Sequence, residues 1–215
     1  MINHDYPGKL IVIEGLDGAG TTTQSALLCK WLQSHIIVPD VLLTQEPSRG
    51  PIGAMIRAAL GKRITFDYLT LAGMYATDRL DHLYCENGVI DQLKKGDWVL
   101  MDRYYLSSFA YQASQMSESE LDWLKAIHEP CLIPDLTIFL DVPVEVCLKR
   151  IEINRQTAFE LFEKKSFLEN VLEQYNIAMT YFKHFGENIV RVDGLQSIKE
   201  IQSEMKNIIT HNLLV

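Results

Sequence analysis

Short apolar runs alternate with longer amphipathic segments along most of the chain. The apolar runs have the length of buried strands, and they lie at 9–14, 41–44, 98–101, 134–142 and 188–192. Between them, apolar residues recur every three or four positions. This spacing predicts helices from Ser25 to about His35, from Pro51, over 66–93 with a break at Asn87-Gly88, over 118–128, from Pro143, over 168–182 and over 198–209. Strands that alternate with helices predict an α/β domain, spanning 1–215, in which helices cover both faces of a parallel sheet.

A glycine-rich loop joins the first predicted strand to the first predicted helix. Its glycines, Gly15, Gly18 and Gly20, allow backbone N–H groups to turn inward around phosphate oxygens at the positive end of the helix. The frame matches G-x-x-x-x-G-K-[ST], with Thr22 at the magnesium-binding hydroxyl, but Thr21 stands where lysine is expected. The predicted phosphate-binding residues are Gly15, Asp17, Gly18, Ala19, Gly20, Thr21, Thr22 and Thr23. A turn that merely joins a strand to a helix is the alternative.

Composition and charge narrow the possible partners. Twenty Lys and Arg residues against 28 Asp and Glu residues give a net charge of −8, which argues against a broad surface for DNA or RNA. No apolar run approaches the ~20 residues of a membrane span, and the first residues lack the layout of a signal peptide. Four cysteines without C-x-x-C spacing and scattered histidines support neither a zinc site nor a disulfide framework. We expect a cytoplasmic protein without a membrane or nucleic-acid partner.

Polar residues cluster where predicted strands end and on one helix face. Asp102 follows the strand at 98–101, at the edge where open parallel sheets bind ligands. Tyr75 and Arg79 are four residues apart and therefore share a helix face. The polar stretch at 151–165 interrupts the helical pattern and is a candidate lid, although it could equally be a solvated helix face.

Five segments in the same order and spacing resemble thymidylate kinases, which belong to the P-loop nucleoside-monophosphate kinases. They are IVIEGLDGAGTTTQ, TQEPSRGPIG, YATDR, GDWVLMDRYYLSSFAYQ and PDLTIFLDVPVEVCLKRI. The resemblance implies a P-loop NTPase fold, with a five-stranded parallel sheet, helices on both faces and a short lid, in a homodimer. It also implies transfer of the γ-phosphoryl group of ATP, with Mg²⁺, to dTMP, giving dTDP.

The resemblance also implies roles for individual residues. Asp17 would lie near the acceptor's 3′-hydroxyl and Arg103 would hold the acceptor phosphate, while Thr22 and Asp102 would lie on the magnesium side. The predicted acceptor site comprises Asp17, Glu46, Pro47, Arg49, Tyr75, Arg79, Arg103, Ser108, Tyr111 and Gln112. Two simpler alternatives stay open. Asp102 and Arg103 could form a surface ion pair, and Tyr75 could be an ordinary core aromatic.

Two cations of the family's pattern are missing. Thr21 replaces the loop lysine, and Gln45 replaces the arginine of an R-E-P loop. Losing one preorganised charge typically costs on the order of 10²–10³ in rate. We hypothesise that Arg49 contacts the acceptor phosphate instead, and that Arg155 of the lid supplies charge at the ATP side as a catalytic residue beside Asp17 and Arg103.

Three functions therefore remain in view. The first is an active thymidylate kinase with a modified phosphate loop. The second is a related kinase with another nucleoside or nucleotide acceptor. The third is a nucleotide-binding protein of negligible turnover.

Overall fold

A computed structural model describes residues 1–35, 38–153 and 165–214. Its strands are β1 (Leu10–Gly15), β2 (Val41–Gln45), β3 (Trp98–Asp102), β4 (Leu136–Asp141) and β5 (Ile189–Asp193). Its helices are α1 (Thr21–Gln33), α2 (Pro51–Leu60), α3 (Tyr68–Tyr84), α4 (Val89–Lys95), α5 (Tyr105–Tyr111), α6 (Glu118–His128), α7 (Val144–Ile153), α8 (Lys165–His184) and α9 (Ile198–Leu213), with a 3₁₀ turn at Ala113–Gln115.

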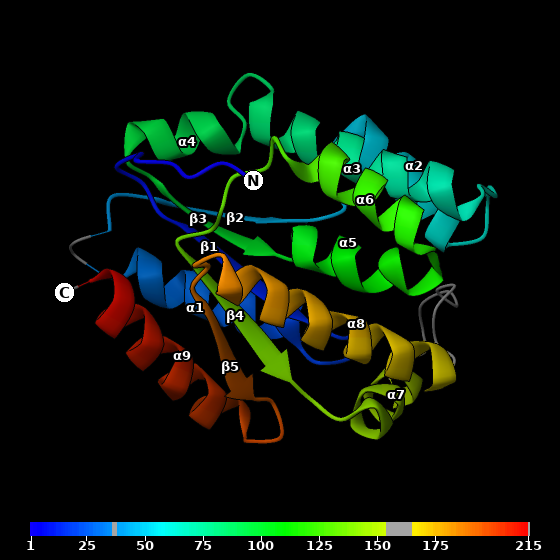
Figure 1. Ribbon diagram of the computed structural model, residues 1–215. Helices are drawn as coiled ribbons and strands as arrows, with labels where there is room; N and C mark the ends of the chain where they lie inside the picture. Colours follow the sequence, from blue (N-terminus) through cyan, green and yellow to red (C-terminus); the bar gives the residue numbers. More distant parts are fainter. Residues whose placement is uncertain (36–37, 154–164, 215) are drawn as a thin grey trace.

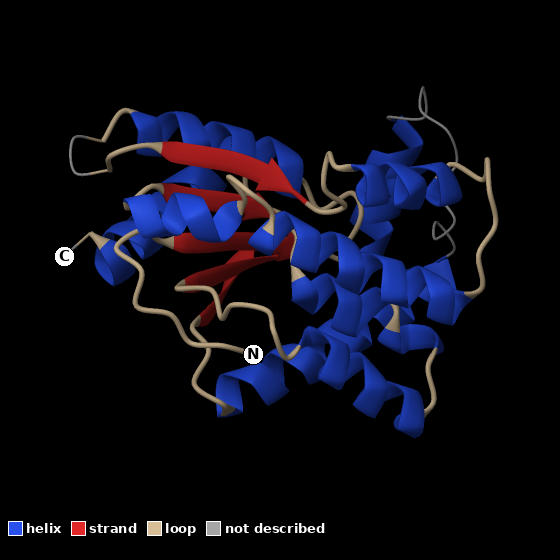
Figure 2. Cartoon of the chain, turned by 90° about the horizontal axis from the view of Figure 1, so that it is seen from above, coloured by secondary structure: helices blue, strands red, loops and turns tan. Residues whose placement is uncertain are grey.

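The strands form one parallel sheet, as the sequence predicts, and the structure gives their order as β2-β3-β1-β4-β5. Helices α1 and α9 pack together on one face, and α5 and α8 pack together on the other (Figures 1 and 2). β1 lies between β3 and β4, so every one of its residues is buried, which explains the apolar run from Leu10 to Ile13. No helix of the described residues is both long and apolar enough to cross a membrane.

The register brings the ends of three strands together. Asp102 at the end of β3 pairs with Ile13 of β1 on one side and with Gln45 of β2 on the other. Residues that follow these strands therefore meet at the same edge of the sheet, where ligands of open parallel sheets bind. The candidate site is built there.

Two predictions of the sequence need separate comment. The segment 41–44 was expected to be a buried strand, but this is wrong for its leucines, since Leu42 is 37% and Leu43 41% exposed. The reason is that β2 lies at an edge of the sheet, where the apolar run alone does not secure burial. The candidate lid at 151–165 falls largely on residues outside the described chain, which includes only its ends in α7 and α8.

Candidate functional site

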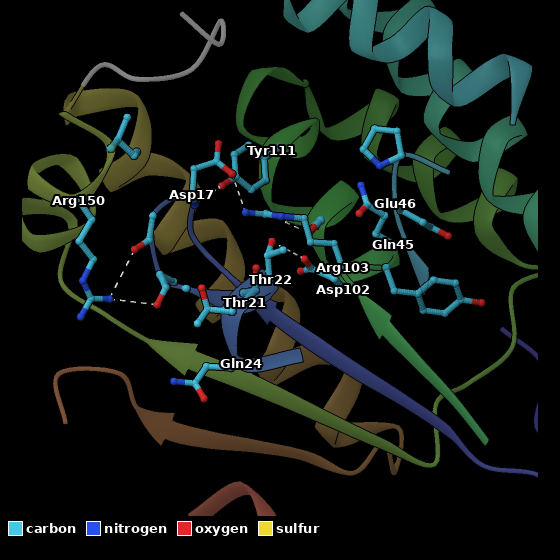
Figure 3. A pocket seen from close by; sticks show the side chains of 18 of the residues that line it. Asp17, Thr21, Thr22, Gln24, Gln45, Glu46, Asp102, Arg103, Tyr111 and Arg150 are labelled. Carbon is cyan, nitrogen blue, oxygen red and sulfur yellow. Dashed lines mark hydrogen bonds and ion pairs between the residues drawn. The ribbon is translucent and has the colours of Figure 1, made fainter. Parts of the chain in front are cut away.

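A cavity of about 680 Å³ opens at the carboxyl ends of β1, β2 and β3 (Figure 3). The predicted residues that line it are Asp17, Gly18, Ala19, Gly20, Thr21, Thr22, Thr23, Glu46, Pro47, Tyr75, Arg79, Asp102, Arg103, Ser108, Tyr111 and Gln112. Gly15 and Arg49 are not among its lining residues, and Arg49 is exposed. Arg155 lies outside the described residues. Segments far apart in the sequence thus contribute to one concave site.

The glycine-rich loop leads directly into α1. Gly18 and Gly20 have φ angles of +85° and +102°, in the left-handed region that favours glycine. A Cβ at Gly18 would lie 2.5 Å from the carbonyl oxygen of Cys147 in α7, so the loop can pack this closely only without a side chain. No side chain caps the start of α1 at Gly20, which leaves backbone N–H groups of the first turn for an anion.

Thr22 and Asp102 meet on the floor of the cavity. The Thr22 hydroxyl donates a hydrogen bond of 2.6 Å to Oδ2 of Asp102. The other carboxylate oxygen, Oδ1, is buried and has no hydrogen-bond partner among the described residues. A hydroxyl and a carboxylate with an unused oxygen form the donor set that Mg²⁺ prefers, so these two residues fit a magnesium ion bound together with a nucleotide.

Arg103 crosses the middle of the site. Its Nη2 lies 2.5 Å from Oδ1 of Asp17, and its guanidinium carbon lies 5.3 Å from the ring centre of Tyr111. The Tyr111 hydroxyl accepts a hydrogen bond of 2.9 Å from the Asp17 backbone N–H, which ties the loop to α5. Burial raises the pKa of Tyr111, so its ring stays neutral beside Asp17. Arg103 therefore pairs with Asp17, whereas Asp102 bonds to Thr22.

Arg79 is buried and held from three sides. Its Nε and Nη2 each lie 2.6 Å from Oε2 of Glu46. Its Nη1 contacts Oγ of Ser108 at 3.0 Å and Nε2 of His128 at 2.5 Å. A guanidinium carries five N–H groups, so these four contacts leave one Nη2 hydrogen without a partner among the described residues. Arg79 faces the cavity with one remaining donor.

His128 was not identified from the sequence. Its Nδ1 lies 2.7 Å from the Leu124 carbonyl and must carry the hydrogen, so Nε2 is left as an acceptor for Arg79. Burial, together with the positive charge of Arg79, lowers the pKa of His128 to about 3. The imidazole is therefore neutral at neutral pH. A lone histidine in an amphipathic helix gives no sequence signal for this role.

Glu14 is a second residue that the sequence analysis missed. It is fully buried at the end of β1, and burial raises its pKa. Its carboxylate accepts hydrogen bonds from the backbone N–H groups of Tyr104 (2.8 Å) and Ser107 (3.2 Å) and from the Tyr175 hydroxyl (2.9 Å). It thereby fixes the start of α5, which carries Ser108 and Tyr111. An acidic residue ending the otherwise apolar KLIVIE run is the signal that could have revealed it.

Comparison with known proteins gives the family. A family model described as thymidylate kinase matches residues 13–205, which is most of the chain. The chain belongs to the thymidylate kinase family. A probable thymidylate kinase from Methanocaldococcus jannaschii is 36% identical over 197 residues, covering 91% of this chain and 92% of the relative. A putative thymidylate kinase from Treponema pallidum is 32% identical over 199 residues, covering 92% of both.

A solved structure agrees with these relatives. The thymidylate kinase of Candida albicans matches with a TM-score of 0.77 and 26% identity, over 97% of this chain and 94% of that chain. The predicted family, the P-loop fold and the assignment to phosphotransferases are thus confirmed. Within this thymidylate kinase family member, the two unusual positions, Thr21 and Gln45, both line the cavity.

Proposed function

We propose that this protein transfers the γ-phosphoryl group of ATP to dTMP, giving dTDP. The observation that carries the proposal is one cavity in which the phosphate loop, with Thr22 and Asp102, faces Arg103 and Arg79 (Figure 3). Such a site can hold two anionic phosphate chains end to end. Phosphoryl transfer requires mainly this positioning, together with stabilisation of charge on the transferred group.

The acceptor needs no general base. The second pKa of a phosphate monoester is about 6, so the dTMP phosphate is largely dianionic at neutral pH. One of its oxygens forms a bond to the γ-phosphorus, while the bond from that phosphorus to the β–γ bridging oxygen breaks. ADP leaves with the electron pair. The protein therefore has to align the two nucleotides and balance their charge.

Each part of the cavity has a proposed role in this reaction. The part of the loop that lines the cavity, residues 17–23, binds the ATP phosphates through backbone N–H groups. Thr22 and Asp102 would hold Mg²⁺, which neutralises charge on the phosphates of ATP when it is bound. Arg103 binds the acceptor phosphate, and Asp17 orients Arg103 through their 2.5 Å contact.

The acceptor nucleoside would lie between α3 and α5. Tyr75 is half-buried and lines the cavity, which supports stacking on the base, and the free Nη2 hydrogen of Arg79 can reach one acceptor atom of that base. Ser108, Tyr111 and Gln112 line the same part of the cavity from α5 and its end. Glu46 and Pro47 complete it at the end of β2.

Two alternatives are favoured by specific observations. The missing cations at Thr21 and Gln45 favour a nucleotide-binding protein of negligible turnover. A different acceptor is favoured by the Candida albicans relative, whose printed title concerns broad substrate specificity. ADP release measured with ATP, Mg²⁺ and a panel of nucleoside monophosphates separates the three. dTMP should be the best acceptor, at about 1–100 s⁻¹.

We also propose that the protein is a homodimer, as the resemblance implies. An apolar groove lies between α3 and α6, and its lining includes Gly73, Ala76, Trp123, Ala126 and Ile127. We propose that the same face of a second copy packs against this groove. Trp123 is 38% exposed there. Light scattering after gel filtration should give twice the chain mass, and Trp123→Glu should reduce it to that of one chain.

A further inference from the structure

Asp78 lies in α3 one residue before Arg79, and it is buried to 1% exposure. It forms no ion pair with a residue of the described chain. Its Oδ2 accepts a hydrogen bond of 2.6 Å from the Ser48 backbone N–H, and its Oδ1 accepts one of 2.6 Å from the Ser48 hydroxyl. Acidic side chains are almost never buried this completely without a partner. The two hydrogen bonds from Ser48 therefore compensate the burial of this carboxylate.

Ser48 belongs to the loop between β2 and α2, and its contacts hold this loop in place. The Ser48 hydroxyl also accepts a hydrogen bond of 3.0 Å from the Gly50 backbone N–H. A Cβ at Gly53 would lie 2.0 Å from the Ser48 carbonyl oxygen, so the loop packs directly against the first turn of α2. If the loop moved away from α3, the buried carboxylate of Asp78 would lose both donors. The loop is thus fixed against α2 and α3, which pack side by side (Figure 1).

The same loop forms one wall of the cavity. Glu46 and Pro47 line the cavity, and Oε2 of Glu46 lies 2.6 Å from Nη2 of Arg79. Two consecutive residues of α3, Asp78 and Arg79, therefore bind Ser48 and Glu46 of the loop, with Pro47 between them. The contact between Asp78 and Ser48 thereby sets the position of this wall relative to Arg79.

We infer that Asp78 is a positioning residue for the acceptor nucleotide, because it holds the loop at 46–50 through Ser48. The inference rests on the proposed function in one respect, namely that the acceptor binds at this end of the cavity. Asp78 does not line the cavity, so it acts through Glu46 and Pro47 and does not touch the nucleotide itself. The competing explanation is that Asp78 only stabilises the packing of α2 against α3.

Positioning and stability can be separated by substitution. Asp78→Ala removes both acceptor oxygens, whereas Asp78→Asn keeps one oxygen and an amide that can donate to the Ser48 hydroxyl. Ser48→Ala removes the hydroxyl but keeps the N–H that donates to the carboxylate. Asp67→Ala is the matched control, because Asp67 accepts hydrogen bonds from the N–H and the hydroxyl of Thr70 at the start of the same helix and does not line the cavity.

Affinities for dTMP and for ATP with Mg²⁺ are measured by isothermal titration calorimetry, and thermal unfolding without nucleotide gives the stability of each variant. We expect Asp78→Ala to weaken dTMP binding by about ten- to a hundredfold, as for loss of hydrogen bonds to a charged group, with ATP binding changed less than about twofold. Ser48→Ala should weaken dTMP binding by about three- to tenfold, and this variant carries the test if Asp78→Ala does not fold. Asp78→Asn should retain most of the affinity for dTMP. Asp67→Ala should lower the melting temperature and leave dTMP binding unchanged.

Three results would overturn the inference. They are unchanged dTMP binding by Asp78→Ala and Ser48→Ala, an equal loss of dTMP and ATP binding in these variants, and a loss of dTMP binding in Asp67→Ala as large as in Asp78→Ala. If the unaltered protein binds ATP but not dTMP, the proposed function fails and this inference fails with it. If the unaltered protein binds dTMP with an affinity that is insensitive to positions 48 and 78, only this inference fails.

Discussion

Nη1 of Arg79 lies 2.5 Å from Nε2 of His128, and both side chains are almost completely buried. The neutral imidazole, held by the Leu124 carbonyl, offers the lone pair of Nε2 to the arginine. A protonated imidazole would instead repel the arginine. Together with Glu46 and Ser108, His128 fixes the plane of the guanidinium. We therefore expect His128 to act as a positioning residue for acceptor binding, although it does not line the cavity itself.

Replacing His128 should affect one substrate and spare the other. His128→Leu removes the acceptor for Arg79, so the KM for dTMP should rise by about 10- to 100-fold, as for loss of a hydrogen bond to a charged group. The KM for ATP should change little. His128→Gln, which can still present an oxygen, should recover most of the loss. Steady-state kinetics with each substrate varied in turn gives these values.

A control separates positioning from general destabilisation. Leu124→Ala removes a fully buried side chain from the same helix, and such changes typically cost about 2–5 kcal/mol of stability. It should lower the free energy of unfolding while leaving the KM for dTMP nearly unchanged below the unfolding temperature. An equal rise of KM in both variants would contradict the positioning role.

The same histidine should make stability depend on pH. Its pKa is about 3 when folded, below the ordinary value of 6.5, so the unfolded state binds more protons between these limits. Stability should therefore be fully retained above the unfolded pKa and fall as the pH drops below it, by at most about 1.4 kcal/mol per pH unit for this one group. The free energy of unfolding, measured with urea at several pH values from 7 to about 5, should fall less steeply with decreasing pH for His128→Gln than for the unaltered protein.

Asp102 should govern the requirement for magnesium. Asp102→Asn removes the negative charge but keeps the size of the side chain, so kcat should fall by on the order of 10²-fold or more and the Mg²⁺ concentration for half-maximal rate should rise. Asp141→Asn, at the end of β4 and outside the cavity, is the matched control and should behave like the unaltered protein. Magnesium titrations of the two variants should therefore separate clearly. Overlapping titration curves would remove Asp102 from the metal site.

Glu14 should matter through α5. Glu14→Ala removes the acceptor for the buried N–H group of Tyr104, and leaving a buried donor unpaired costs about 1–3 kcal/mol. Glu14→Gln still presents an oxygen, so it should lose less. Chemical unfolding gives both costs. If Glu14→Gln were as unstable as Glu14→Ala, the hydrogen bonds would not be the source of the loss.

The parts of the fold that local patterns determine could be predicted from the sequence. The strand–loop–helix unit around Gly18 and the shared helix face of Tyr75 and Arg79 follow from spacing alone, and both occur at the cavity. The exposure of Leu42 could not be predicted, because it depends on the place of β2 at the sheet edge.

Contacts between residues that are far apart in the chain could not be predicted from the sequence either. The contacts of His128 with Arg79 and of Arg150 with the phosphate loop join segments 49 and more than 130 residues apart, so no local pattern signals them. The hypothesis for Arg49 came from its distance along the chain to Gln45. Arg49 is exposed and does not line the cavity, so its contact with the acceptor phosphate stays a prediction.

The most direct measurement is ADP release by the purified protein with ATP, Mg²⁺ and each nucleoside monophosphate in turn, repeated with Thr21→Lys. We predict turnover of the unaltered protein with dTMP as the best acceptor, at about 1–100 s⁻¹, and little further gain from the added lysine. No turnover with any acceptor, together with activity regained by Thr21→Lys, would contradict the proposal and indicate a fold kept for nucleotide binding.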